Sequence, residues 1–158
     1  MRFASLIEEA AAGRLAAWED KAEEALALVV VLDQFPRNIH RGSPLAFAAD
    51  AQARDVAGRA LARGFDFILP RARRFFFYLP YEHSEDLADQ ERSVALFRAW
   101  VETCAPEKRA EAEHHFAAIL RHQEIIQRFG RFPHRNAALG RAMTEEEVEF
   151  LKEPRSSF

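Results

Sequence analysis

The spacing of apolar side chains predicts helices along the whole chain. Residues 20–34 are apolar nearly all round, with Leu28 and Leu32 on one face and Val29 and Val30 on the others. A helix that is apolar on every side is buried at the centre of a fold. No segment alternates apolar and polar residues with the period of two that a half-buried strand requires. The pattern therefore predicts an all-α protein.

Capping residues, prolines and glycines set the expected boundaries of these helices. The predicted helices run from about residue 2 to 12, 20 to 34, 50 to 63, 70 to 80, 84 to beyond 101, 106 to 129, and 144 to 151. Asp20, Asp50 and Ser84 are the expected N-caps of the second, third and fifth helices. Pro36 should stop the second helix, because proline lacks a donor and disfavours a helical residue before it. A polar loop is expected at residues 37–42.

The later helices carry apolar stripes. The residues expected to face inward are Leu87, Val94, Phe97 and Val101, then Phe116, Ile119, Leu120, Ile126 and Phe129. Thr144 and Glu147 have the spacing of a capping box for the last helix. Nothing in the sequence marks a linker or a domain boundary. Residues 1–158 are therefore predicted to form a single domain of antiparallel helix hairpins stacked side by side.

The composition fits a globular chain in a reducing compartment. Hydrophobic residues make up 49% and charged residues 30% of 158 residues, enough for a real core. Cys104 is the only cysteine, which excludes an internal disulfide. The net charge of -3 gives no reason to expect nucleic acid, and the apolar run at residues 25–32 is too short to span a bilayer. We expect a cytoplasmic protein without nucleic-acid or membrane partners.

Two matched segments follow two of the long helices. They are Asp33-Gln34-Phe35-Pro36-Arg37-Asn38 and Arg131-Phe132-Pro133-His134-Arg135-Asn136, here called the first and second corner. In each, phenylalanine can anchor in the core and proline forces a turn, so that arginine and asparagine sit at a fixed place. A guanidinium there can grip a carboxylate or phosphate through two parallel hydrogen bonds. The alternative is that these side chains satisfy helix-terminal carbonyls or lock one hairpin to the next.

A third polar segment, Tyr81-Glu82-His83-Ser84-Glu85-Asp86, leads into a helix that continues with Asp89 and Gln90. Asp86, Asp89 and Gln90 lie within one turn of that helix. Gln90 also falls on its apolar side, and the arginines and asparagines of the corners are candidate partners for a buried glutamine. His83 is a candidate base, oriented by Asp86 or Glu85. The alternative is a solvated acidic first turn that favours the helix dipole.

Other histidines give two further candidates and no metal site. His122 lies two turns before Phe129 and approaches the second corner, which contains His134, so both are candidates for proton transfer. For His122 the alternative is a hydrogen-bonded core histidine. Glu111 and His114 match the Glu-x-x-His spacing of di-iron bundles, but the sequence lacks the second copy that such a site needs. We expect neither a metal nor another cofactor.

Three segments, taken in order, carry a family resemblance. They are Leu-Asp-Gln-Phe-Pro-Arg-Asn at 32–38, His-Ser-Glu-Asp-Leu-Ala-Asp-Gln-Glu at 83–91 and Arg-Phe-Gly-Arg-Phe-Pro-His-Arg-Asn at 128–136. With them the chain closely resembles the bacterial domain-of-unknown-function family DUF924 over nearly its whole length. His122 and residues 153–158 also fit the family pattern. The resemblance implies an all-α fold similar to tetratricopeptide-type hairpin stacks, and it implies no established activity, substrate or cofactor.

The start of the chain departs from that family pattern. Members usually begin with an additional aromatic-rich helical segment, and this chain starts at a point like the family's second helix. If that segment covers the core, its absence would leave an apolar patch. We therefore expect a homodimer through this surface or a reduced stability.

Two functions compete, and the sequence leaves open whether either is enzymatic. In the first, the three polar segments converge on a pocket for a small anionic molecule. The candidate ligand-binding residues are Asp33, Gln34, Arg37, Asn38, Asp89, Gln90, Arg131, Arg135 and Asn136. The candidate proton-transfer residues are His83, Asp86, His122 and His134. Asp33 or Asp86 would orient the histidines. In the second, the hairpins form a groove for a peptide or partner helix and the polar segments are structural locks. A further reading is one buried polar network without any ligand.

Overall fold

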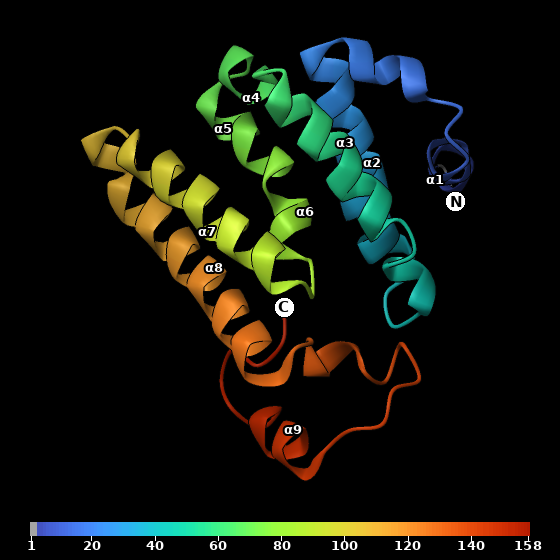
Figure 1. The fold of residues 1–158 in the computed structure, drawn as a ribbon, viewed down its shortest axis with the longest axis vertical. Coiled ribbons are helices and arrows are strands. Elements are labelled where there is room, and N and C mark those ends of the chain that lie inside the picture. The colour runs from blue at the N-terminus through green and yellow to red at the C-terminus, as the bar shows by residue number, and fades with distance from the viewer. Residues whose placement is uncertain (1–2) are drawn as a thin grey trace.

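The computed structural model describes residues 3–158, and within that range it contains helices and no strand (Figure 1). The α-helices are α1 (Ala4–Ala11), α2 (Ala22–Ile39), α3 (Asp50–Ala62), α4 (Phe65–Ile68), α5 (Arg71–Arg74), α6 (Leu79–Glu82), α7 (Leu87–Glu102), α8 (Arg109–Phe129) and α9 (Glu145–Phe150). The 3-10 helices are η1 (Ala16–Asp20), η2 (Pro44–Ala46), η3 (Phe75–Phe77), η4 (Pro106–Lys108) and η5 (Pro133–Arg135). The all-α prediction is confirmed. The predicted start of the first helix at Arg2 lies outside the described residues.

Two helix hairpins frame the molecule. α2 packs against α3 and α7 against α8, and the short helices α5 and α6 lie between the two pairs (Figure 1). The largest core cluster runs through α2, α3, η3 and α7, where Leu32, Ala57, Phe77 and Phe97 are at most 2% exposed. A smaller cluster around Phe132 holds α9 against the end of α8. This arrangement brings the ends of α2 and α8 towards the same region.

Pro36 does not end the second helix, contrary to the prediction. α2 continues to Ile39, with Pro36 buried inside it. The side chains that follow the proline help to satisfy the preceding turn: Arg37 donates to the carbonyl of Asp33 at 3.0 Å and Asn38 to that of Gln34 at 2.8 Å. Residues 37–39 are thus helical rather than part of a loop, and the Arg-Asn pair of the first corner lies on the last turn of α2.

The predicted N-caps are shifted by one or two residues. Lys21 and Ala49 precede α2 and α3 without a side-chain cap, so Asp20 and Asp50 are free for other partners. Asp86, not Ser84, caps α7 by accepting from the amide of Ala88 at 2.8 Å. The predicted helix at 70–80 is divided into α5, η3 and the start of α6, with Pro80 inside α6 rather than at an end.

The capping box and most of the apolar stripes agree with the sequence. Thr144 and Glu147 form the predicted box at the start of α9. Leu87 and Leu120 are wrong members of the stripes, since they are 42% and 41% exposed. Ile125, which the stripe omitted, is 1% exposed.

Candidate functional site

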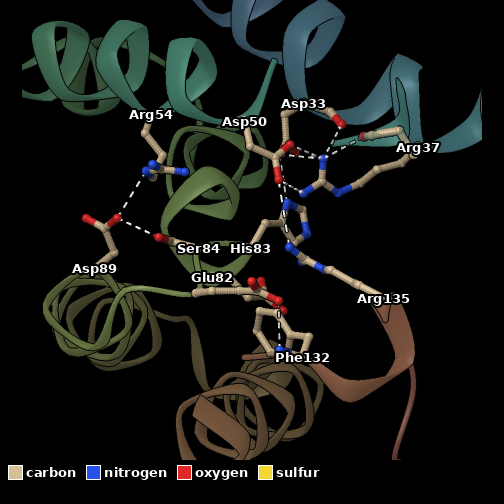
Figure 2. A network of polar contacts seen from close by, with 12 residues as sticks. Asp33, Arg37, Asp50, Arg54, Glu82, His83, Ser84, Asp89, Phe132 and Arg135 are labelled. Atoms are coloured by element: carbon tan, nitrogen blue, oxygen red, sulfur yellow. Dashed lines mark hydrogen bonds and ion pairs between the residues drawn. The ribbon is translucent and has the colours of Figure 1, made fainter. Parts of the chain in front are cut away.

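The two corners meet at one carboxylate of α3 (Figure 2). Arg37 at the end of α2 donates from both terminal nitrogens to the two oxygens of Asp50, at 2.7 and 2.9 Å. Arg135, from η5 after α8, lies with a terminal nitrogen 3.8 Å from the same carboxylate. Paired, two-point bonds of this kind fix the orientation of both groups. Asp50 therefore joins segments from opposite ends of the chain.

Arg135 is held mainly by aromatic rings. Its guanidinium lies 4.8 Å from the ring centre of Phe47 and 4.4 Å from that of Phe132, and its Nε has no hydrogen-bond partner among residues 3–158. Burial, together with the nearby charge of Arg37, lowers the pKa of Arg135 to about 10. A cation with this environment is stabilised by ring contacts more than by hydrogen bonds.

His83 is paired with Asp33 and not with the acids that follow it. Its Nδ1 lies 2.7 Å from a carboxylate oxygen of Asp33, whose other oxygen accepts from Gln34 at 2.5 Å. Burial favours the neutral form of Asp33, but His83 and Arg37 outweigh it and hold its pKa at about 2. Asp33, Glu85 and Asp86 were the predicted orienting residues, and of these Asp33 is the one that contacts His83. Asp86 is an exposed helix cap.

Gln90 holds the turn on which His83 lies. It is fully buried, and its side-chain amide donates to the carbonyls of Glu82 at 2.6 Å and Ser84 at 2.7 Å. Its predicted partners, the corner arginines and asparagines, are therefore not the ones it uses. The hydroxyl of Ser84 donates to Asp89 at 2.7 Å, and Asp89 also pairs with Arg54 of α3 at 3.0 Å (Figure 2).

The remaining corner residues serve local contacts. Arg131 pairs with Glu147 of α9 at 2.6 and 2.8 Å, which attaches the last helix to the second corner. Asn136 is fully buried at the end of η5. Asn38 is exposed on the last turn of α2. These residues do not join the cluster around Asp50, so the predicted set is divided between several places.

Glu85 neither orients His83 nor forms only a solvated helix start, the two interpretations that its sequence position allowed. Its carboxylate accepts from the amide of Phe132 at 2.8 Å and from Arg141 at 2.6 and 2.9 Å. Burial opposes ionisation, but Arg141 and the Phe132 amide lower the pKa of Glu85 below its usual range. The start of α7 is thereby tied to the second corner.

His122 and His134 lie near the same corner and are uncharged at neutral pH. Burial lowers the pKa of His122 to about 3 and that of His134, with help from Arg135, to about 4. His122 Nδ1 donates to the carbonyl of Ala118 at 2.8 Å, and its ring stacks on Phe158 with centroids 3.7 Å apart. His122 therefore combines the contacts of a hydrogen-bonded core histidine with a position beside Glu82, whose Oε1 is 3.3 Å from Nδ1.

A cavity of about 520 Å³ opens between α5, η3, α6, α7 and α8. Its apolar walls include Phe75, Leu79, Phe97, Trp100 and Ile119. Its charged or titratable lining residues are Arg71, Glu82, Lys108, Glu111 and His115. Of these described residues, Glu82 is the one that is buried, at 7% exposure. Burial raises the pKa of Glu82 to about 7, against the opposing effect of His83.

Sequence reasoning missed Glu82, Asp50 and Arg141 as members of this region. Asp50 was interpreted as a helix cap, and Arg141 was not among the candidate residues. Glu82 lies in a four-residue helix, which is too short to show a helical period. One signal was available in the sequence: Glu82 directly follows Leu79, Pro80 and Tyr81. An acidic residue next to an apolar run can be buried with it, and a buried carboxyl group needs a polar partner.

Two structural features are absent from the described residues. No group of three or more His, Cys, Asp or Glu side chains within residues 3–158 is arranged to hold a metal ion. None of the helices in that range combines the length and apolarity needed to cross a bilayer.

Comparisons with known proteins identify a family without an assigned activity. The family described as a bacterial protein of unknown function (DUF924) matches residues 1–155. A solved structure, described as a protein of unknown function, ATU0120, from Agrobacterium tumefaciens, is 40% identical and superposes with a TM-score of 0.82. That match covers 97% of this chain and 81% of the other. No curated protein matches the sequence. The chain belongs to the DUF924 family.

Proposed function

We propose that the protein binds a small, largely apolar molecule in the cavity between the α5–α6 segment and the α7–α8 hairpin. The observation that carries the proposal is a cavity of about 520 Å³ with aromatic and aliphatic walls and one buried carboxyl group, that of Glu82. Small-molecule sites are usually concave and apolar, with few polar groups that set orientation. The network around Asp50 then serves as the frame that holds the α6 turn, and Glu82 with it.

An anionic ligand at the corners has weaker support. Arg37 and Arg131 already make two-point bonds to Asp50 and Glu147 within the chain. A free anion would have to displace the carboxylate of Asp50 or of Glu147. Each carboxylate belongs to the same chain as the arginine it binds and is therefore present at a high effective concentration. Arg135 has an unpartnered Nε, but that atom is buried. The polar segments are better explained as supports for the neighbouring cavity.

A neutral fluorescent probe tests the proposal. N-phenyl-1-naphthylamine brightens on entering an apolar site, and we expect a saturable rise in its fluorescence with the wild-type protein. Ala118 lines the cavity on α8, while its neighbour Ala117 is exposed and does not. Ala118→Leu should fill part of the cavity and weaken binding, whereas Ala117→Leu adds the same atoms to the surface and should not. Absent binding, or equal binding by both variants, would refute the proposal.

A further inference from the structure

We propose that the ligand of this cavity carries a basic nitrogen, which binds as an ammonium ion against the carboxylate of Glu82. The inference rests on the proposed function, because it names the chemical class of the ligand for the same cavity. It concerns an amine with an apolar or aromatic body, in contrast to the anion that the arginine-rich corners led us to expect.

The first argument is that no arginine or lysine in the described part of the chain pairs with Glu82. The polar contact of its carboxyl group within the described residues is His122 Nδ1 at 3.3 Å. The proton on that nitrogen is directed to the carbonyl of Ala118, which is closer at 2.8 Å. Because His122 is neutral at neutral pH, it supplies no positive charge. A buried carboxylate without a counter-ion is costly, and a ligand cation would remove that cost.

The second argument is that the charges behind Glu82 are engaged with one another. On the α2 side, Asp33 pairs with His83 at 2.7 Å and lies 3.5 Å from Arg37. Arg37 in turn makes its two-point bond to Asp50. Arg37 and His83 are thus paired with the carboxylates of Asp50 and Asp33, and no ion pair joins either of them to Glu82 within the described residues. Arg135, the third basic side chain here, lies against Asp50 between the rings of Phe47 and Phe132. A cation that pairs with Glu82 would therefore come from the cavity side.

The third argument concerns the cationic residues that line the cavity. Arg71 is fixed on Trp100: its Nε and a terminal nitrogen donate to the Trp100 carbonyl at 3.2 and 2.9 Å, and its guanidinium lies 3.7 Å from the indole centre. Lys108 is exposed and pairs with Glu111 at 3.3 Å. His115 is exposed on α8. None of these described side chains pairs with Glu82, so the buried part of the cavity favours a positive ligand group over a negative one.

The walls suit an aromatic or aliphatic amine. Phe97 and Phe75 flank Trp100, with ring centroids 6.2 and 6.3 Å from it. Aromatic faces stabilise apolar rings by contact and cations by their quadrupole. An amine with a short apolar body can therefore bury the body among these rings while its nitrogen reaches a carboxylate oxygen.

Binding of an ammonium ion requires the ionised form of Glu82, which gives a pH signature. With a pKa of about 7 in the free protein, Glu82 is increasingly protonated below neutral pH. A bound ammonium would displace that proton to solvent. Affinity for an amine should then fall about tenfold per pH unit below 7 and level off above it. A neutral ligand of the same shape should show no such fall.

Displacement of N-phenyl-1-naphthylamine by three matched compounds tests the inference. At pH 8 we expect 2-phenylethylamine to bind at least about tenfold more tightly than 2-phenylethanol, which is the gain typical of a hydrogen bond to a charged group. We expect 3-phenylpropanoate to bind most weakly of the three. Glu82→Gln should abolish the preference for the amine over the alcohol, so that the two compounds bind with similar affinity. The variant imitates the protonated side chain, and Glu113→Gln on the exposed face of α8 is its control.

The outcomes separate the two proposals. Probe binding with equal, pH-independent affinities for amine and alcohol would overturn the inference and leave the apolar site standing. Tighter binding of 3-phenylpropanoate would also overturn it. Absent probe binding would overturn both. If Glu82→Gln fails to fold, the pH profiles of amine and alcohol on the wild-type protein decide the matter, because only the amine profile should bend near pH 7.

Discussion

The guanidinium groups of Arg37 and Arg135 lie against the same carboxylate, that of Asp50, with N–O distances of 2.7 and 3.8 Å. The two arginines repel each other, since the charge of Arg37 adds to burial in lowering the pKa of Arg135. Asp50 offsets that repulsion from the first turn of α3. One residue thus connects the end of α2, the start of α3 and the segment after α8.

Asp50→Asn should destabilise the protein by about 3 kcal/mol, the cost typical of removing one partner from a buried ion pair. The side chains of Asp50, Arg37 and Arg135 are 14%, 17% and 7% exposed, so solvent screens the remaining charges only slightly. Urea unfolding at neutral pH measures the loss. Asp55→Asn on the exposed face of α3 should change stability by less than about 0.5 kcal/mol. Equal effects of the two substitutions would show that Asp50 is not a structural link.

The two arginines should differ when each is replaced by methionine, which removes the charge and keeps an unbranched apolar stem. Arg37→Met leaves the buried Asp33 short of a partner and should cost about 3 kcal/mol. Arg135→Met removes a cation whose Nε is unpartnered but keeps an apolar chain between Phe47 and Phe132, so its effect should lie within about 1 kcal/mol. Chemical unfolding of both variants measures this contrast. A larger loss from Arg135→Met would mean that its charge is essential to the corner.

The capping box of α9 should be measurable by itself. Thr144 accepts from the amide of Glu147 at 3.2 Å, and the Glu147 carboxylate accepts from the amide of Thr144 at 2.8 Å. Thr144→Ala removes one of these bonds and should cost about 1 kcal/mol. Thr144→Ser keeps the hydroxyl and should recover most of the loss. If serine and alanine behave alike in urea unfolding, the hydroxyl bond contributes nothing.

The helices could be predicted from the sequence because their periodicity is local. The exceptions depend on contacts that no pattern of apolar residues reveals. α2 continues through Pro36 to Ile39, where the side chains of Arg37 and Asn38 donate to the carbonyls of Asp33 and Gln34. The division of residues 70–80 into short helices likewise depends on how Phe77 and Tyr81 pack in the core.

The candidate site was harder to predict because its geometry is set by long-range packing. The three polar segments stand out in the sequence, and all three do meet. The corners meet at Asp50, and the segment at 81–86 contacts the first corner through His83 and the second through Glu85. Which acid pairs with which arginine is not a local property, so Asp50 was missed and Asp86 was wrongly favoured beside Asp33. Glu82 was named only as part of a segment, since its burial follows from the packing of α6 between α3 and α7.

Glu82 should make the protein less stable as the pH rises through neutrality. Burial raises its pKa from 4.5 to about 7, so the folded state retains a proton that the unfolded chain releases. A raised acid pKa gives stability that is fully present below about pH 4.5 and is lost as the pH rises through 7, in total about 3 kcal/mol. Glu82→Gln stays neutral throughout and should not show this loss.

The measurement is the difference between Glu82→Gln and wild type in urea unfolding at pH 5, 6, 7 and 8. His122 has the opposite sign, because its lowered pKa removes stability as the pH falls from about 6.5 towards 3. Since both proteins contain His122, its contribution cancels in the difference. The stability of the variant relative to wild type should rise by up to about 3 kcal/mol across this range. Parallel profiles would mean that Glu82 ionises in the folded protein as it does in the unfolded chain, with no burial cost to offset.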